Sequence, residues 1–309
     1  MNEVFHPGEV RVQEQTGSRQ MSLNVGRMIN PSLLPQAVGF LEAQNMLILS
    51  SSNAEGLVWS SVLFGETGFI EVPDLNRIII HLDQLQHELD DVLFQNLKEF
   101  EGIGSMFIDM ARQRRYRVNG TAWIVGNKLE ISVQQAYGNC PKFIQKRARA
   151  GEYVMEKVAP RQTEGKTLNA RQLDLISKAD TFFVGSRNQA GHMDISHRGG
   201  NPGFIQILPD QTLKVPDYQG NNLFNTLGNF ADDPHAGLLF IDFESGNVLQ
   251  LTGKAELLFD QTSDDDLNRT TGTGRYWLFQ TENWIETHHQ HHADWELFGR
   301  SMFNPEIPE

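Results

Sequence analysis

The 309-residue sequence contains one cysteine and no long apolar run, and both absences exclude classes of protein. A single cysteine cannot form a disulfide within the chain, which is typical of a reducing compartment. No stretch approaches the roughly 20 apolar residues of a membrane-spanning helix. Residues 1–13 have neither the basic start nor the apolar core of a signal peptide. We therefore expect a cytoplasmic protein without a membrane partner.

Positive charge is also scarce, with 26 Lys and Arg against 39 Asp and Glu and a net charge of −13. Nucleic acids are bound mainly by clustered Lys and Arg, so we expect no nucleic-acid partner. The run Arg112–Arg117 is basic, but its place at a predicted hairpin favours a solvated turn. This composition still allows a small basic pocket.

The sequence does contain a distant copy of itself. Gly56–Ile70 aligns without a gap with Gly191–Ile205, and further matches follow in the same order. An ordered series of matches indicates two halves of like fold. The copies differ where Ser60–Leu63 faces Ile195–Arg198, and we expect function to lie at such differences.

Strand patterns dominate both halves. The predicted strands are 46–49, 56–62, 68–72, 77–81, 105–110, 117–125 and 128–137, then 181–184, 192–196, 203–208, 212–215, 237–243, 248–259 and 275–281. Helical spacing is confined to 31–44, 85–100, 168–178 and 222–230. Closely spaced strands without regular crossover helices predict a mainly β protein with an antiparallel barrel of about six strands in each half.

The chain divides into four predicted segments. Residues 1–30 form a polar N-terminal arm, and residues 31–147 form the first barrel. Residues 148–166 belong to a basic stretch without periodicity and are the predicted linker. Residues 167–309 form the second barrel.

The second half carries two clusters suited to an anion. Arg198 ends a predicted strand and offers a flat fork of donors, while Gly199 and Gly200 let a ligand approach the main chain. A hairpin turn with a surface arginine is the alternative interpretation of this cluster.

The other cluster is predicted at a helix start, where Asn221 and Asn222 precede a face that includes Thr226. A helix start attracts anions, although capping by Asn221 with a solvated face is the alternative. The first half has Asp90-Asp91 at the corresponding place, which suits capping but repels phosphate.

No metal site is predicted. The run HHQHH at 288–292 has two histidines spaced four apart, but no reliable further ligand shares their spacing. We interpret the run as an exposed polar turn.

These clusters, with three other segments, make the chain resemble a known family. The resemblance is carried by FHPGE at 5–9, GNCPKFIQKR at 138–147, DISHRGGNPGFIQI at 194–207, GNNLFNTLGNF at 220–230 and GLLFIDFESGNVLQLTGKAEL at 237–257. The sequence is similar to the pyridoxamine 5′-phosphate oxidase-like FMN-binding split barrels, in particular a branch with a duplicated barrel. The resemblance implies two tandem six-stranded split β-barrels with FMN between two barrels.

The resemblance also implies which residues bind FMN. Its phosphate is expected at Ser196, His197 and Arg198 and at the helix start with Asn221 and Asn222. This sequence has asparagines where the family often has Lys or Arg at that helix start. Arg198 is therefore expected to carry most of the positive charge.

Two further cofactor-binding residues are implied outside these clusters. Gln250 is the expected donor to the isoalloxazine, and Lys142 is the expected contact from the first barrel. The sequence is compatible with an internal pair of barrels and with a homodimer through the second barrels.

The expected function is that of an FMN-dependent oxidoreductase with a small-molecule redox substrate. The catalytic Arg and His of true pyridoxamine phosphate oxidases have no clear match near the C-terminus, so that activity is not expected and the catalytic residues stay unidentified. The alternative is a non-catalytic flavin carrier or stress-response protein.

Overall fold

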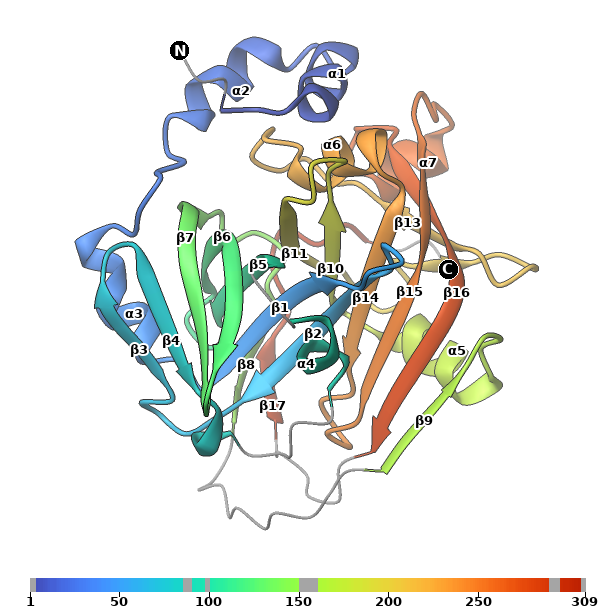
Figure 1. Cartoon of the computed structure of the whole chain (residues 1–309). Helices are drawn as coiled ribbons and strands as arrows, with labels where there is room; N and C mark the ends of the chain where they lie inside the picture. Colours follow the sequence, from blue (N-terminus) through green and yellow to red (C-terminus); the bar gives the residue numbers. More distant parts are fainter. Residues whose placement is uncertain (1–3, 86–90, 98–100, 150–160, 289–294, 307–309) are drawn as a thin grey trace.

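The structure is a computed structural model that describes all residues except 1–3, 86–90, 98–100, 150–160, 289–294 and 307–309. Two curled antiparallel sheets form its body, and short helices lie around them (Figure 1). The helices are α1 Pro7–Gln15, α2 Arg19–Gly26, α3 Val38–Glu42, α4 Val92–Asn96, α5 Ala170–Lys178, α6 Asn225–Asp232 and α7 Asp264–Arg269. Within the described residues, every helix is too short or too polar to cross a lipid bilayer.

The first sheet has the strand order β2-β1-β5-β6-β7-β4-β3. Its strands are β1 Met46–Ser52, β2 Val58–Phe64, β3 Ile70–Asp74, β4 Arg77–His81, β5 Glu101–Asp109, β6 Arg114–Val125 and β7 Lys128–Asn139. Every neighbouring pair is antiparallel.

The second sheet repeats this order as β11-β10-β14-β15-β16-β13-β12, with β9 added on β16. Its strands are β9 Arg161–Gly165, β10 Thr181–Arg187, β11 Met193–Gly199, β12 Gln206–Ile207, β13 Leu213–Pro216, β14 His235–Ile241, β15 Val248–Leu258 and β16 Tyr276–His288. The predicted mainly β fold of antiparallel split barrels is confirmed. Each of the two strand orders contains seven strands rather than six, because the hairpins β3–β4 and β12–β13 each contribute two strands.

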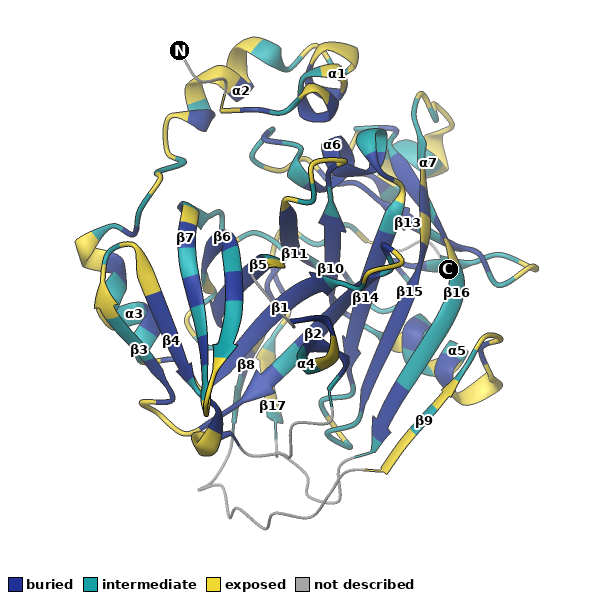
Figure 2. Cartoon of the chain, in the orientation of Figure 1, coloured by how far each residue is buried: buried dark blue, intermediate teal, exposed yellow. Residues whose placement is uncertain are grey.

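The apolar runs of β1 and β10 reflect burial on both faces (Figure 2). Leu47 and Leu49 of β1 point into the core of the first sheet. Met46 and Ile48 point the other way, into a third core shared with Phe183 and its neighbours on the second sheet. The two sheets therefore pack face to face within one chain.

Glycines and one serine bring the sheets into backbone contact. Ser60 Oγ of β2 donates to the carbonyl oxygen of Gly237 at 2.8 Å and accepts the N–H of Gly185 at 2.9 Å. A Cβ at Gly237 would lie 2.7 Å from both Trp59 Cα and the Val58 carbonyl oxygen. Side chains larger than hydrogen would force the sheets apart at this point.

Replacing Gly237 with alanine is therefore expected to lower the free energy of unfolding by about 1–3 kcal/mol. The clash is with backbone atoms, which cannot turn away as a flexible side chain would. Urea unfolding of the variant and the wild type measures the difference. Equal midpoints and slopes would show that β2 can shift without cost.

The N-terminal arm is more ordered than the sequence predicted. Residues 7–26 form α1 and α2, and α1 packs on α6 of the second half. Gln13 Nε2 donates to the carbonyl oxygen of Leu223 at 3.0 Å, and Ser22 Oγ donates to that of Asn222 at 2.7 Å. The residues that these two hydrogen bonds join are 210 and 200 positions apart in the sequence.

Two other predicted elements lie partly outside the described residues, and a third, the linker, differs from prediction. The helix expected at 85–100 is described only as α4, since 86–90 and 98–100 lie outside the described residues. The predicted linker has paired strands at its ends, because β8 Lys146–Arg149 pairs with β17 Trp295–Gly299 and β9 pairs with β16. The predicted turn HHQHH lies outside the described residues except for His288, the last residue of β16.

Candidate functional site

A cavity lies where the end of β11 and the start of α6 meet β6 and β7 of the first sheet. Eight of the ten predicted cofactor-binding residues line it together: Lys142, Ser196, His197, Arg198, Gly199, Asn221, Asn222 and Thr226. Lys142 and Cys140 reach it from the first half, just after β7. Both halves of one chain therefore build the cavity.

The helix that borders the cavity begins later than predicted. Asn221 and Asn222 form the turn before α6, whose first residue is Asn225. Asn222 has a positive φ of 59°, a conformation that asparagine tolerates better than most residues. Asn221 Oδ1 accepts the N–H of Leu223, which fixes this turn.

Two predicted residues do not lie in the cavity. Gly200 is outside its lining, and its N–H donates to the carbonyl oxygen of Asp180 at 3.1 Å. Gln250 is fully buried at the far side of the sheet contact, where Nε2 donates to Ser61 Oγ at 3.1 Å and to Asp91 at 3.2 Å. The prediction that Gln250 faces the same ligand as Arg198 is corrected by this geometry.

The charge of the cavity is strongly positive although the protein is acidic. Its lining contains one carboxylate, Asp217, and five cationic side chains, Arg115, Arg117, Lys142, Arg198 and Arg275, of which Arg117 pairs with Asp194 outside the lining. Asp217 accepts from Arg198 Nη1 at 2.9 Å and pairs with Arg275 at 3.0 Å. One carboxylate is thus shared by two guanidinium groups.

Arg115 has no carboxylate partner among the described residues. It donates through Nε to the carbonyl oxygen of Cys140 at 3.0 Å and through Nη1 to His197 Nδ1 at 2.9 Å. Burial and the positive charge of Arg117 and Arg198 lower the pKa of Arg115 to about 9, so it remains a cation at neutral pH. An uncompensated cation of this kind favours an anionic ligand.

His197 is neutral in this setting. Burial and the positive charge of Arg115 and Arg198 hold its pKa well below the usual value. Because Nδ1 accepts from Arg115, the ring hydrogen sits on Nε2, which is buried without a partner. The imidazole therefore presents a donor that no protein group uses.

Four other residues that line the cavity also have buried polar atoms without a partner. They are Arg117 Nε, Asn139 Oδ1, Arg198 Nε and the Tyr218 hydroxyl. Buried polar groups are paired in the great majority of proteins, so a cluster of exceptions needs an explanation. A ligand rich in acceptor oxygens would satisfy the donors among them.

Sequence reasoning missed Arg115 and Arg117, which it placed in a solvated turn. Arg112 does lie exposed and pairs with Asp109 at 2.8 Å. Arg115 and Arg117, two residues apart on β6, point to the same side of the strand and reach the cavity. Their alternation with the buried Tyr116 and Val118 was the signal available in the sequence.

The corresponding place on the first sheet is closed by the protein itself. Gln250 aligns with Arg117, and Ser61 aligns with Ser196. Gln250 is hydrogen bonded to Ser61, and Arg117 to Ser196, across the contact between the sheets. Arg117 Nη2 donates to Ser196 Oγ at 2.6 Å, whereas Gln250 meets Ser61 together with Asp91. Burial raises the pKa of Asp91, whose carboxyl would repel a phosphate. Among the described residues of the two aligned positions, those around Ser196 line a cavity with positive charge, whereas Gln250 and Ser61 are buried.

Comparison with known proteins gives matches at the level of structure alone. No protein family model and no curated protein matches the sequence. HupZ from Group A Streptococcus is 16% identical, covers 38% of this chain and 90% of its own, and gives a TM-score of 0.31. A putative pyridoxamine 5′-phosphate oxidase from Lactobacillus delbrueckii is 14% identical, with 38% and 92% covered and a TM-score of 0.31. An FMN-binding protein from Syntrophomonas wolfei is 11% identical, with 37% and 80% covered and a TM-score of 0.27. Each of these solved structures thus corresponds to less than half of the chain.

Proposed function

We propose that the chain binds FMN in this cavity, with the phosphate between Arg115 and Arg198. The observation that carries the proposal is the excess of cations in the lining: Arg198 and Arg275 share the single carboxylate of Asp217, Arg117 pairs with Asp194, and Arg115 has no carboxylate partner among the described residues. A phosphate supplies the negative charge that Arg115 lacks and the acceptor oxygens that Arg198 Nε and the Nε2–H of His197 lack. In this proposal residues 167–309 provide most of the site and residues 31–147 complete it.

Other residues would hold the rest of the cofactor. Ser196 and Thr226 bring hydroxyl groups that already share a hydrogen bond of 2.9 Å. Tyr218 and Phe143 line the cavity as a tilted ring pair with centroids 4.7 Å apart, which gives a flat heteroaromatic ligand an apolar wall. The similarity of residues 194–207 and 220–230 to the FMN-binding split barrels selects FMN among phosphate-bearing ligands.

We further propose that the protein is a flavin-dependent oxidoreductase with a small-molecule substrate. Bound FMN supplies hydride or single-electron transfer, and the protein supplies binding, orientation and electrostatics. At neutral pH the uncharged His197 donates a hydrogen bond rather than acting as a base. Arg115, Arg117 and Arg198 would stabilise negative charge that develops nearby.

A flavin carrier without catalysis is the second candidate, and one observation favours it. Among the described residues that line the cavity, Asp217 is bound by two arginines and His197 is held neutral. The lining therefore lacks an obvious pair of groups for proton transfer. Oxidation of NADH or NADPH by the flavin-loaded protein, at a rate well above free FMN, would exclude a pure carrier.

The purified protein is expected to carry flavin absorbance and to reach one FMN per chain on reconstitution. One site follows from the closure of the Ser61 side by Gln250 and Asp91. The absorbance spectrum, with protein concentration measured independently, gives the ratio. A ratio of two would contradict the closed first-sheet position, and no uptake of FMN would overturn the proposed function.

A further inference from the structure

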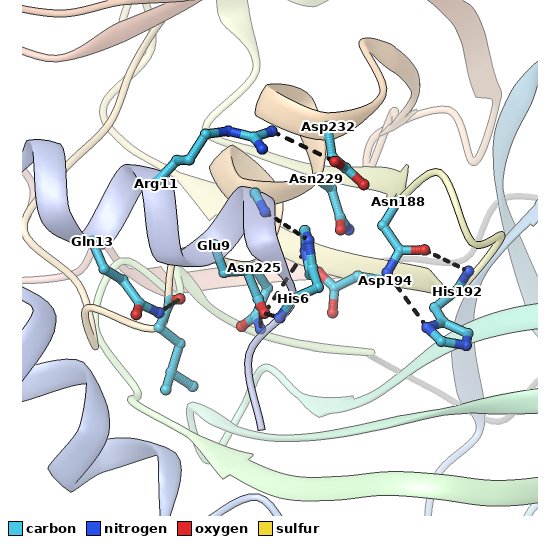
Figure 3. Close-up of polar contacts among 12 residues, drawn as sticks. His6, Glu9, Arg11, Gln13, Asn188, His192, Asp194, Asn225, Asn229 and Asp232 are labelled. Atoms are coloured by element: carbon cyan, nitrogen blue, oxygen red, sulfur yellow. Dashed lines mark hydrogen bonds and ion pairs between the residues drawn. The ribbon is translucent and has the colours of Figure 1, made fainter. Parts of the chain in front are cut away.

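A second polar cavity lies beneath α1, next to the flavin cavity. Asn225 lines both cavities, and His6 and Glu9 of α1 face it from the arm (Figure 3). The motif FHPGE at 5–9, one of the segments that carry the family resemblance, therefore lies beside the proposed site. From the sequence it was assigned to the polar arm, and none of its residues was named as cofactor-binding.

Each residue of this motif places α1 against α6. Phe5 is buried, His6 caps the helix, and Pro7 occupies its first turn, where a missing N–H costs nothing. Gly8 lies so close to the carbonyl oxygen of Gly228 that no side chain fits between the helices. This close approach brings Glu9, the next residue, within reach of Asn225.

Glu9 is buried and its two carboxylate oxygens have different partners. Oε2 accepts the backbone N–H of His6 at 2.9 Å, which completes a capping box. Oε1 accepts from Asn225 Nδ2 at 2.6 Å. An ionised carboxylate can only accept, so it selects the orientation of the Asn225 amide with its NH₂ group toward Glu9.

The other end of that amide faces the flavin cavity. Asn225 Oδ1 accepts from Arg117 Nη1 at 3.1 Å and from the Tyr137 hydroxyl at 3.2 Å. The same guanidinium pairs with Asp194 at 3.1 Å and donates through Nη2 to Ser196 Oγ. The position of Arg117 in the cavity is thus connected to α1 through one amide.

We propose that Glu9 is a positioning residue of the flavin site, which acts by fixing the Asn225 amide so that its oxygen holds Arg117 and Tyr137. The inference rests on the proposed FMN site and extends it to the N-terminal arm. When Glu9 is protonated, its carboxyl can donate as well as accept, and the amide is free to reverse. A reversed amide would turn donors toward Arg117, which would lose its acceptor.

Several charged and titratable groups face Glu9. They are His6 on α1, Asp194 on β11, Arg117 on β6, Tyr137 on β7, His192 before β11 and the exposed Arg11–Asp232 pair of α1 and α6. Burial raises the pKa of Glu9 to about 7; Asp194 adds to the rise, and hydrogen bonds from His6 and Asn225 oppose it. Glu9 therefore changes charge within the physiological range.

The test measures FMN dissociation constants by flavin fluorescence for the wild type and Glu9→Gln between pH 6 and 8. At pH 8 the variant is expected to bind FMN about tenfold more weakly, because a neutral amide no longer fixes Asn225. Ionisation of the FMN phosphate changes affinity with pH in both proteins. Wild-type affinity should rise more steeply with pH than that of the variant, because only the wild type also ionises Glu9. Equal affinities and equal slopes would overturn the inference.

A double-mutant cycle separates positioning from a purely structural role. In an Asn225→Ala background, Glu9→Gln should cause no further loss of FMN affinity, because the amide is gone. Arg11→Ala is the matched control on the same helix, where Arg11 Nη2 donates to the exposed α6 surface, and it should leave FMN affinity unchanged. A loss of affinity in Arg11→Ala equal to that in Glu9→Gln would assign the effect to docking of the arm and overturn the inference.

A measurement without FMN checks the ionisation itself. The folded pKa of Glu9, about 7, lies above its ordinary value of 4.5, so the folded state binds the proton more tightly. The free energy of unfolding should therefore fall as pH rises from about 4.5 to 7, and Glu9→Gln should reduce that fall. An unchanged slope would overturn the inference. Failure of the wild type to bind FMN would instead overturn the proposed function along with it.

Discussion

Replacing Arg198 with alanine is expected to weaken FMN binding by about 1.5–3 kcal/mol, which raises the dissociation constant roughly 10- to 150-fold. Arg198 reaches the cavity from β11, and its buried Nε has no partner in the protein. The fold should survive the change, because Asp217 keeps its ion pair with Arg275. Titration of the apoprotein with FMN, followed by flavin fluorescence, measures the effect.

Two controls accompany this variant. Leu63 occupies the aligned position in the first half and is buried in the first core, so Leu63→Ala should lower the free energy of unfolding by about 2–5 kcal/mol without changing FMN affinity. Arg112→Ala removes the same charge from an exposed position. If Arg112→Ala weakens FMN binding as much as Arg198→Ala, the effect comes from net charge in general. If Arg198→Ala binds FMN as tightly as the wild type, the placement of the phosphate is contradicted.

Replacing Arg117 with leucine is expected to lower the free energy of unfolding by about 3–5 kcal/mol, the usual cost of leaving one partner of a buried ion pair alone. Arg117 and Asp194 are both nearly inaccessible to solvent, and 3.1 Å separates their charged atoms. The change leaves Asp194 buried without a cation and also removes the donor to Ser196. Urea unfolding gives the difference in stability.

The double variant Arg117→Leu/Asp194→Asn provides the control for this second prediction. Removing the unpaired carboxylate should restore part of the stability, because the largest penalty is the buried charge and not the lost contact. FMN affinity should stay low in both variants. Stability of the double variant below that of the single variant would show that Asp194 contributes through its other hydrogen bonds.

Much of the fold could be predicted because its periodicities are local. The apolar runs at 46–49 and 181–184 predicted strands that the structure contains. The ordered matches between the halves predicted like folds, and the two sheets have the same strand order. The SHRGG run and the asparagine-rich turn, predicted as one anion-binding site, line a single cavity apart from Gly200. The α1 and α2 helices were missed because their sequence is polar: α1 depends on its capping box and on packing against α6, and α2 is joined to the second half through Ser22.

The error at Gln250 has a geometric cause. The family resemblance implied that Gln250 is the donor to the isoalloxazine. In the structure, however, Gln250 on β15 crosses the sheet contact to Ser61 of β2, and Arg117 on β6 crosses it to Ser196 of β11. Each half therefore supplies the residue that reaches the aligned serine of the other half, and it is Arg117 rather than Gln250 that lines the cavity with Arg198.

The sequence by itself determined the strands, the like strand pattern of the two halves and most residues of one edge of the cavity, because these depend on neighbours along the chain. Only the tertiary structure decided that β6 supplies two arginines to that edge, that Gln250 and Asp91 close the other position, and that Glu9 lies beside Asn225. These contacts join residues 79 to 216 positions apart. They exist because two twisted sheets and one helix pack without space between their backbones, a constraint that no local pattern of residues records.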